Sequence, residues 1–263
     1  MISFVGAGPG APDLITLRGR DRLAAADVVV WASSLVPEAM LAHARPGAAI
    51  HDSATMTLED VLSVYAGAPD AVAVVRLHSG DPSIYGAIGE QIDWCIARER
   101  SFEIVPGVSS LAAASAAVGR ELTQPGVAQS VVLTRLAGRT SASMPPGESV
   151  AAFAAHGTTM AVFLSAARPV ELAGELLAAG SGYVADTPAA IVVRASWPDE
   201  QVVLTTVGSL AGDLAELGAR TTVLVLVGPA LAGAGRRSHL YSPGFAHMFR
   251  RRSAPGTTTG RPA

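Results

Sequence analysis

The 263-residue sequence contains no lysine, and all 19 of its basic residues are arginines. Without lysine there is no P-loop lysine, no Schiff-base lysine and no lysine general base. Cys95 is the single cysteine, which excludes an internal disulfide and any zinc site built from several cysteines. The six histidines are scattered, and none pair at metal-ligand spacing. Many chemistries that side chains carry out alone are therefore missing, and we predict no resident metal.

Long apolar runs and a charged leader are missing too. No hydrophobic run approaches the roughly 20 residues that span a bilayer. The chain starts directly with a strand-like segment at residues 2–5, which predicts a cytoplasmic protein without a signal peptide. A net charge of −3 argues against binding nucleic acid by bulk electrostatics. The arginine clusters at 236–237 and 250–252 favour a solvated tail or a dimer contact.

Strand-like and helix-like segments alternate through the first half of the chain. The strands are expected at residues 2–5, 28–31, 49–51, 72–77 and 102–105, and the helices at 14–25, 37–43, 58–66, 88–99 and 109–118. This βαβ alternation predicts a parallel sheet.

A Pro-Gly turn signal within residues 119–129 interrupts that alternation and predicts a domain boundary. Further strands are expected at 130–135, 160–165, 189–194, 201–205 and 223–227, with helices at 149–156, 169–178 and 209–217. The gap between 194 and 201 is too short for a helical crossover, so a hairpin is expected there and a mixed sheet with it. We predict an α/β fold with an N-terminal domain at 1–120, a C-terminal domain at 128–231 and an Arg/Gly/Pro-rich tail at 232–263, its end disordered.

The residues from 79 to 86 are the first that suggest a ligand. An apolar strand leads into Ser79-Gly80-Asp81-Pro82, and a helical pattern follows. In open α/β sheets, ligands bind outside the carboxyl ends of the strands. We therefore expect this loop to touch a small molecule. Asp81 is compatible with a general base, a ligand-anchoring carboxylate or a helix N-cap.

The motif Val5-Gly6-Ala7-Gly8-Pro9-Gly10 is similar to the start of a dinucleotide-binding fingerprint. However, Pro9 and Pro12 occupy the turn that should present free N–H groups to a pyrophosphate. The third glycine is misplaced, and no acidic residue ends the second predicted strand. A loop whose backbone lies close to a different ligand fits better.

No activated nucleophile is evident. The chain lacks a Gly-x-Ser-x-Gly elbow. Ser109 and Ser110 are interpreted first as helix N-caps, a role that is compatible with ligand contact. His78 is equally well explained as a buried structural histidine. The combination favours chemistry carried by a reactive cofactor, while the protein supplies position and excludes water.

Three motifs resemble those of a known family. The run at residues 6–16, the Gly80-Asp81-Pro82 triplet and the segment at 106–110 are similar to the tetrapyrrole (uroporphyrinogen III C-methyltransferase-like) methylases, which use S-adenosylmethionine. Segments at 31–36, 52–58, 76–87 and 195–200 narrow the resemblance to the branch that methylates precorrin-4 at C11.

This resemblance implies two α/β domains with the methyl donor in the cleft between them, usually in a homodimer. It also implies S-adenosylhomocysteine as a product. Carried over by motif, the donor site comprises Pro9, Ser79, Gly80, Asp81, Ile84, Tyr85, Ser109, Ser110, Leu164, Ala195 and Thr222. Leu164 departs from the methionine of many relatives.

The implied reaction agrees with the missing nucleophile. A reduced tetrapyrrole carbon is already nucleophilic and a sulfonium methyl is electrophilic, so in-line approach and a dry site suffice. Arginines suit the carboxylates of the substrate, and the candidates are Arg76, Arg135, Arg139 and Arg194. Asp81 or His78 would accept the lost proton. A cobalt-loaded precorrin-4, another ring position, and a non-catalytic S-adenosylmethionine-binding regulator remain alternatives.

Overall fold

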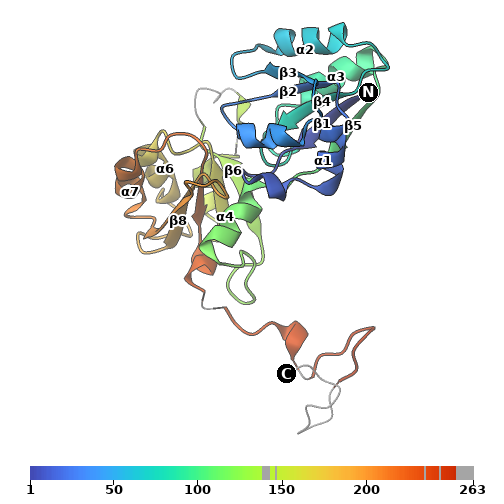
Figure 1. Cartoon of the computed structure of the whole chain (residues 1–263). Helices are drawn as coiled ribbons and strands as arrows, with labels where there is room; N and C mark the ends of the chain where they lie inside the picture. The colour runs from blue at the N-terminus through green and yellow to red at the C-terminus, as the bar shows by residue number, and fades with distance from the viewer. Residues whose placement is uncertain (138–142, 146, 234, 243, 253–263) are drawn as a thin grey trace. The chain divides into compact units, whose positions relative to one another are not determined.

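A computed structural model describes residues 1–137, 143–145, 147–233, 235–242 and 244–252 (Figure 1). The chain divides into two compact units. The first comprises Met1–Val118 together with Val192–Val202 and Arg220–Leu224, and the second comprises Gly119–Ile191, Val203–Ala219 and Val225–Ala263. Two short segments from the second half of the sequence thus belong to the first unit.

The first sheet is fully parallel, as predicted. Its strands are β1 (Ile2–Gly6), β2 (Val28–Trp31), β3 (Ala49–Asp52), β4 (Val74–His78) and β5 (Phe102–Val105), in the order β3-β2-β4-β1-β5. The register places Gly6 at the end of β1 opposite His78 at the end of β4. The loops that follow β4, β1 and β5 therefore start side by side at one edge of the sheet.

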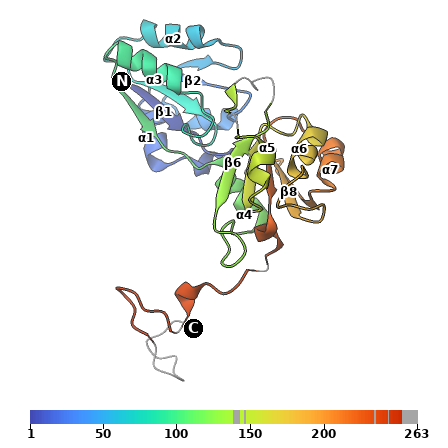
Figure 2. The same cartoon turned by 180° about the vertical axis from the view of Figure 1, so that it is seen from behind.

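Helices cover both faces of this sheet (Figures 1 and 2). Helix α1 (Leu17–Ala24) lies on one face, and α2 (Leu58–Gly67) and α3 (Gly89–Ala97) lie on the other; α4 (Ser110–Val118) follows β5. Side chains alternate along β1, so that Val5 joins the apolar cluster on the α1 side and Phe4 the cluster on the α2/α3 side. Burial on both faces explains the continuous apolar strands of the sequence.

Two predicted helices differ from the structure. The helix expected from residue 14 begins at Leu17, because Pro12–Leu14 form a separate 3₁₀ turn (η1). Thr16 caps the α-helix by accepting a hydrogen bond from the Gly19 N–H at 3.1 Å. The helix expected at 37–43 is the 3₁₀ helix η2 (Glu38–His43). Pro37 precedes it and Pro46 follows three residues after its end, so the helical segment stays short, and 3₁₀ geometry is common in short segments.

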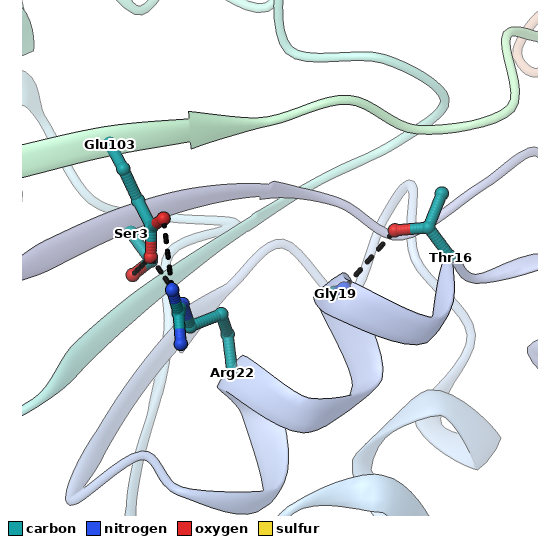
Figure 3. A network of polar contacts seen from close by, with 5 residues as sticks. All are labelled: Ser3, Thr16, Gly19, Arg22 and Glu103. Carbon is teal, nitrogen blue, oxygen red and sulfur yellow. Dashed lines mark hydrogen bonds and ion pairs between the residues drawn. The ribbon is translucent and has the colours of Figure 1, made fainter.

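Glu103 on β5 joins α1 to the sheet (Figure 3). Its carboxylate accepts a hydrogen bond from the Ser3 hydroxyl of β1 at 2.8 Å and pairs with Arg22 of α1. The hydrogen bond from Arg22 is the main cause that lowers the pKa of Glu103. At the other end of α1, the Thr16 hydroxyl donates to the Pro106 carbonyl at 3.4 Å. Both ends of α1 are thus fixed to the strand and loop around β5.

The second sheet is mixed, as predicted. Its strands are β6 (Val131–Arg135), β7 (Thr159–Phe163), β8 (Pro188–Val193), β9 (Gln201–Thr206) and β10 (Val223–Val227), in the order β6-β7-β10-β8-β9. β6 runs parallel to β7, and β10 runs antiparallel to it. Neighbouring strands β8 and β9 are joined by the seven residues 194–200, the position of the expected hairpin.

Three helices accompany this sheet: α5 (Val150–Ala154), α6 (Pro169–Leu176) and α7 (Leu210–Leu217). The 3₁₀ turns η4 (Pro229–Ala232) and η5 (His239–Tyr241) follow toward the C-terminus. Across the described part of the chain, no helix has both the length and the apolar character needed to cross a membrane. The tail end that we expected to be disordered lies outside the described residues.

Candidate functional site

The loops that follow β1 and β4 are hydrogen-bonded to each other. The Gly80 N–H donates to the Gly8 carbonyl at 2.7 Å, and the Gly8 N–H donates back to the Gly80 carbonyl at 3.3 Å. Before this bridge, the Ala7 N–H donates to the His78 carbonyl at 2.8 Å. The N–H groups at the start of the glycine-rich loop therefore bond to protein, which agrees with our argument against a pyrophosphate site.

The loop that follows β5 packs against both of them, backbone on backbone. A Cβ at residue 107 would lie 2.1 Å from the Gly80 carbonyl oxygen, and a Cβ at residue 6 would lie 2.5 Å from the Gly107 Cα. No side chain fits at either distance. Gly6 and Gly107 are thus required by the close approach of three loops that are distant in sequence.

Asp81 connects the loops after β4 and β5. Its Oδ2 accepts a hydrogen bond from the Gly107 N–H at 2.9 Å, and its Oδ1 accepts one from the Ser83 N–H at 2.8 Å. Both carboxylate oxygens are therefore engaged by backbone donors. Asp81 thus anchors protein backbone, and its bond to the N–H two residues further on is of the capping kind that was one of the alternatives for this residue.

The start of α4 lies beside the bridge. Gly80 has a left-handed backbone (φ 65°), and a Cβ there would lie 3.5 Å from the Ser110 nitrogen and 3.8 Å from the Ser109 Cα. The Ser109 hydroxyl accepts a hydrogen bond from the Leu111 N–H at 3.3 Å, which confirms the predicted capping. The first unit thus brings Gly80, Asp81, Ser109 and Ser110 together.

The segment after β8 also reaches this region. The Trp197 indole N–H donates to the Pro9 carbonyl at 3.0 Å, and the Ala11 N–H donates to the Ser196 hydroxyl at 3.0 Å. The Arg194 N–H donates to the Thr222 carbonyl at 2.8 Å. These bonds bring the stretch with Ala195, Thr222 and Pro9 into one part of the first unit.

Several candidate residues have a strained backbone. Tyr85, Arg194 and Thr222 have left-handed φ values of 55°, 51° and 55°, and Leu164 in the second unit has one of 52°. Such conformations cost non-glycine residues roughly 1–3 kcal/mol and tend to occur at functional sites. Tyr85 and Leu164 are also 48% and 68% exposed. Each side chain therefore has surface that is available to a ligand.

Two further candidates near Asp81, Ser79 and Ile84, are each half-buried. Tyr85 between Ile84 and Gly86 is exposed, so it does not belong to the core. The β4–α3 loop therefore presents both polar and apolar side chains.

Arg76 and His78 lie on the α2/α3 side of β4. Arg76 Nη1 donates to the Ser53 hydroxyl at 2.7 Å, and this hydroxyl donates to the Trp31 carbonyl at 2.9 Å. His78 is 7% exposed, and its Nε2 has no hydrogen-bond partner among the described residues. Burial is the main cause that lowers the pKa of His78 to about 3, and the charge of Arg76 is the second cause. The imidazole is therefore neutral at pH 7.

Within the described residues, no ion pair includes Arg76. Burial lowers the pKa of its guanidinium. Tyr65, whose charge when ionised would favour the guanidinium, instead donates to Gln91 at 2.7 Å. Sequence analysis did not find Ser53 or Tyr65 as neighbours of Arg76. Ser53 follows β3 and Tyr65 lies on α2, so the sequence pattern of β4 does not predict these contacts.

The second unit places two candidates together. Arg135 and Phe163 are register partners at the ends of parallel β6 and β7, and Leu164 directly follows Phe163. Arg135 donates to the Ser143 hydroxyl at 2.9 Å. Arg139 lies outside the described residues. Within the described ranges, no three His, Cys, Asp or Glu side chains are grouped closely enough to hold a metal ion.

Comparison with known proteins agrees with these motifs. The profile of the Tetrapyrrole (Corrin/Porphyrin) Methylases matches residues 1–211, which include all three glycine-containing loops. The chain belongs to this family. The resemblance seen in the sequence is therefore confirmed.

Relatives in the tetrapyrrole methylase family cover nearly the whole chain. A precorrin-4 C(11)-methyltransferase from Sinorhizobium sp. is 45% identical over 95% of this chain and 98% of its own length. The crystal structure of a cobalt-precorrin-4 methyltransferase is 41% identical and covers 88% of this chain and 95% of its own, with a TM-score of 0.83. A Thermus thermophilus uroporphyrin-III C-methyltransferase in complex with S-adenosylhomocysteine is 30% identical and covers 88% and 99%, with a TM-score of 0.72.

Proposed function

We propose that the protein is an S-adenosylmethionine-dependent C-methyltransferase that methylates C11 of precorrin-4, giving precorrin-5 in cobalamin biosynthesis. The observation that carries the proposal is the 45% identity to a precorrin-4 C(11)-methyltransferase over 95% of the chain, together with three packed loops in which Gly6 and Gly107 leave no room for a side chain. Lower identity, 30%, to a uroporphyrin-III methyltransferase favours the C11 branch over that relative's reaction.

The residues present fit an adenosyl ligand. The exposed ring of Tyr85 suits its base, and the serines at the start of α4 suit its polar groups. When bound, S-adenosylmethionine supplies an electrophilic methyl group, and S-adenosylhomocysteine remains after transfer. The residues proposed to hold it are Pro9, Ser79, Gly80, Asp81, Ile84, Tyr85, Ser109, Ser110, Leu164, Ala195 and Thr222.

The chain's own part in the reaction is to position the reactants and exclude water. Asp81 uses both oxygens to hold two backbone N–H groups, so we assign it to positioning rather than to proton transfer. His78 is neutral, buried and carries a pKa of about 3, which makes it a weak base. These observations favour a proton acceptor other than the two candidates from the sequence.

The arginine candidates differ in how available they are to the carboxylates of the substrate. Arg194 leaves 43% of its side chain exposed and pairs with Asp199, a partner that a substrate carboxylate can replace. Arg76 is half-buried without a carboxylate partner, a costly arrangement that an anion would relieve. Arg135 and Arg139 remain candidates from the second unit.

Two substrates distinguish the proposal from its nearest alternative, cobalt-precorrin-4, which the 41% identical solved relative favours. The purified protein is incubated with S-adenosylmethionine and either metal-free or cobalt-loaded precorrin-4, and the products are analysed by mass spectrometry. We expect one added methyl group on the metal-free substrate. Addition to the cobalt form alone would replace the proposal by the alternative, and addition to neither would refute both.

The ring position needs a second measurement. Transfer from S-adenosylmethionine with a ¹³C-labelled methyl group, followed by NMR of the product, locates the new carbon. We expect it at C11. A signal at another position would keep the reaction class and refute the specific assignment.

We further propose a homodimer and a cytoplasmic location, with neither nucleic acid nor membrane as a partner. The family resemblance supports the dimer. An internal use of one tail arginine supports the lack of a nucleic-acid role: the Arg250 guanidinium donates to the carbonyls of Ser242 and Phe245 at 3.0 and 3.1 Å. It also lies 5.9 Å from the centre of the Phe245 ring.

A further inference from the structure

The loop at residues 194–200, between β8 and β9, is itself closely tied together. The Trp197 N–H donates to the Arg194 carbonyl at 2.9 Å, and the Ser196 N–H donates to a Glu200 carboxylate oxygen at 2.6 Å. The Arg194 guanidinium lies 4.6 Å from the centre of the Trp197 ring and pairs with Asp199. Arg194 and Ser196 are both held in left-handed conformations, with φ values of 51° and 66°. A loop this constrained presents its indole in one orientation.

That indole lies directly against the glycine-rich loop after β1. It donates to the Pro9 carbonyl at 3.0 Å, and a Cβ at residue 10 would lie 2.2 Å from Trp197 Cδ1. The neighbouring Ser196 hydroxyl accepts from the Ala11 N–H at 3.0 Å. Three consecutive residues of the glycine-rich loop are therefore fixed by two consecutive residues that lie 185 or more positions away. Gly10 is required because the ring covers it.

We infer that Trp197 is a positioning residue for the methyl donor: its indole holds the glycine-rich loop in the shape that binds S-adenosylmethionine. The inference rests on the proposed function, which assigns Pro9 to the donor site. The carbonyl that receives the indole N–H is that of Pro9 itself, so loss of the bond frees a residue of the site. The same ring stacks with Arg194, a candidate for substrate carboxylates. One ring thus joins the donor loop to a substrate arginine.

The sequence supplies a matched control. Trp94 on α3 is half-buried and carries Arg98 at 4.6 Å from its ring centre, the same stacking distance as in the Arg194–Trp197 pair. It has no contact with the glycine-rich loop among the hydrogen bonds of the described residues. Trp94→Phe therefore removes an arginine-stacked indole without altering the donor loop.

The test is isothermal titration of S-adenosylhomocysteine into the full chain. Trp197→Phe keeps an aromatic ring but removes the indole N–H that bonds to Pro9. We expect it to bind S-adenosylhomocysteine about fivefold more weakly, which is the effect of one lost hydrogen bond. The KM for S-adenosylmethionine should rise while kcat at saturating donor is retained, and the melting temperature should match that of Trp94→Phe. Trp94→Phe should bind as the wild type does.

Equal affinities of Trp197→Phe and the wild type would overturn the inference and leave the proposed function intact. If the wild type itself binds no S-adenosylhomocysteine, the proposed function fails and the inference falls with it. A double-mutant cycle tests the steric contact separately. Gly10→Ala should weaken binding strongly in the wild type and much less in Trp197→Ala, where the added methyl finds open space. Equal losses in both backgrounds would also contradict the inference.

Discussion

Asp81 acts at the scale of a single residue as a bridge between two loops. Its two oxygens accept the N–H groups of Gly107 and Ser83, and each would lose its acceptor if the side chain were removed. The Gly107 N–H is part-buried, and a buried backbone donor left without an acceptor costs about 1–3 kcal/mol, whereas water can replace the acceptor of the exposed Ser83 N–H. The carboxylate therefore contributes to stability as well as to the shape of the proposed donor site.

Replacing Asp81 separates these contributions. Asp81→Ala should lower the melting temperature and weaken S-adenosylhomocysteine binding together, because both N–H groups lose their acceptor. Asp81→Asn keeps one acceptor oxygen and should show a smaller loss in both measurements, by calorimetry and isothermal titration. A large loss of turnover in Asp81→Asn without any change in binding or stability would instead indicate a direct role in catalysis.

His78 makes stability depend on pH. Its pKa is lowered from 6.5 to about 3 in the folded protein, so between these values the unfolded chain binds more protons. Stability is therefore full above pH 6.5 and falls as the pH drops below it. By pH 5 the loss amounts to about 2 kcal/mol.

Unfolding of the wild type and of His78→Gln at pH 7 and pH 5 measures this dependence. The variant should be less sensitive to acid, because the group that titrates in the unfolded state is gone. His156→Gln, at an exposed position, is the matched control and should retain the wild-type response. Equal pH dependence in all three proteins would show that His78 titrates alike in both states.

At the scale of elements, the three loops after β1, β4 and β5 form one backbone-packed unit. Gly107 is a point of close contact between two of these loops, since a Cβ there would lie 2.1 Å from the Gly80 carbonyl oxygen. The Gly80 carbonyl and the Gly107 Cα both belong to backbone that is fixed by strands, so neither can move away without displacing a loop. The effect of a single methyl group should therefore extend to the whole donor site.

Gly107→Ala tests this unit. We expect a clear drop in melting temperature and strongly reduced binding of S-adenosylhomocysteine. Gly89→Ala is the control, because a Cβ at the start of α3 meets no atom within 4 Å and alanine favours a helix. That variant should be neutral or more stable by up to about 1 kcal/mol. Normal binding by Gly107→Ala would mean that the loops can separate without harm to the site.

The sequence predicts the elements far better than the contacts between them. All ten strands that the described residues form were expected, because apolar runs and turn residues are local signals. The contact of Trp197 with Pro9 was not expected, since it joins residues 188 positions apart and depends on how the chain returns to the first unit. The same holds for Ser53 beside Arg76, because Ser53 follows β3 and Arg76 lies on β4, and β2 separates these two strands in the sheet.

At the scale of the whole molecule, the sequence pattern places a boundary between residues 120 and 128, while contacts divide the chain differently. Residues 192–202 and 220–224 belong to the first unit. The sequence pattern does not predict that these two segments belong to the first unit, because the composition hardly changes along β8, β9 and β10. The candidate residues Ala195 and Thr222 lie in these returning segments, which explains how sites distant in sequence share one unit.

The tail carries several exposed large apolar side chains. Met248 and Phe249 are 87% and 86% exposed, and Leu240 and Tyr241 of η5 are 49% and 55% exposed. Monomers seldom expose neighbouring large apolar side chains, and a second copy of the chain would cover them. We therefore expect light scattering after size exclusion to give twice the chain mass of 26.7 kDa.

Met248→Ser/Phe249→Ser should weaken the dimer because burial of two large side chains is lost, whereas Val170→Ser, at a residue 77% exposed on α6, should not. A monomeric wild type would refute the homodimer, and an unchanged dimer in the double variant would place its interface elsewhere on the molecule.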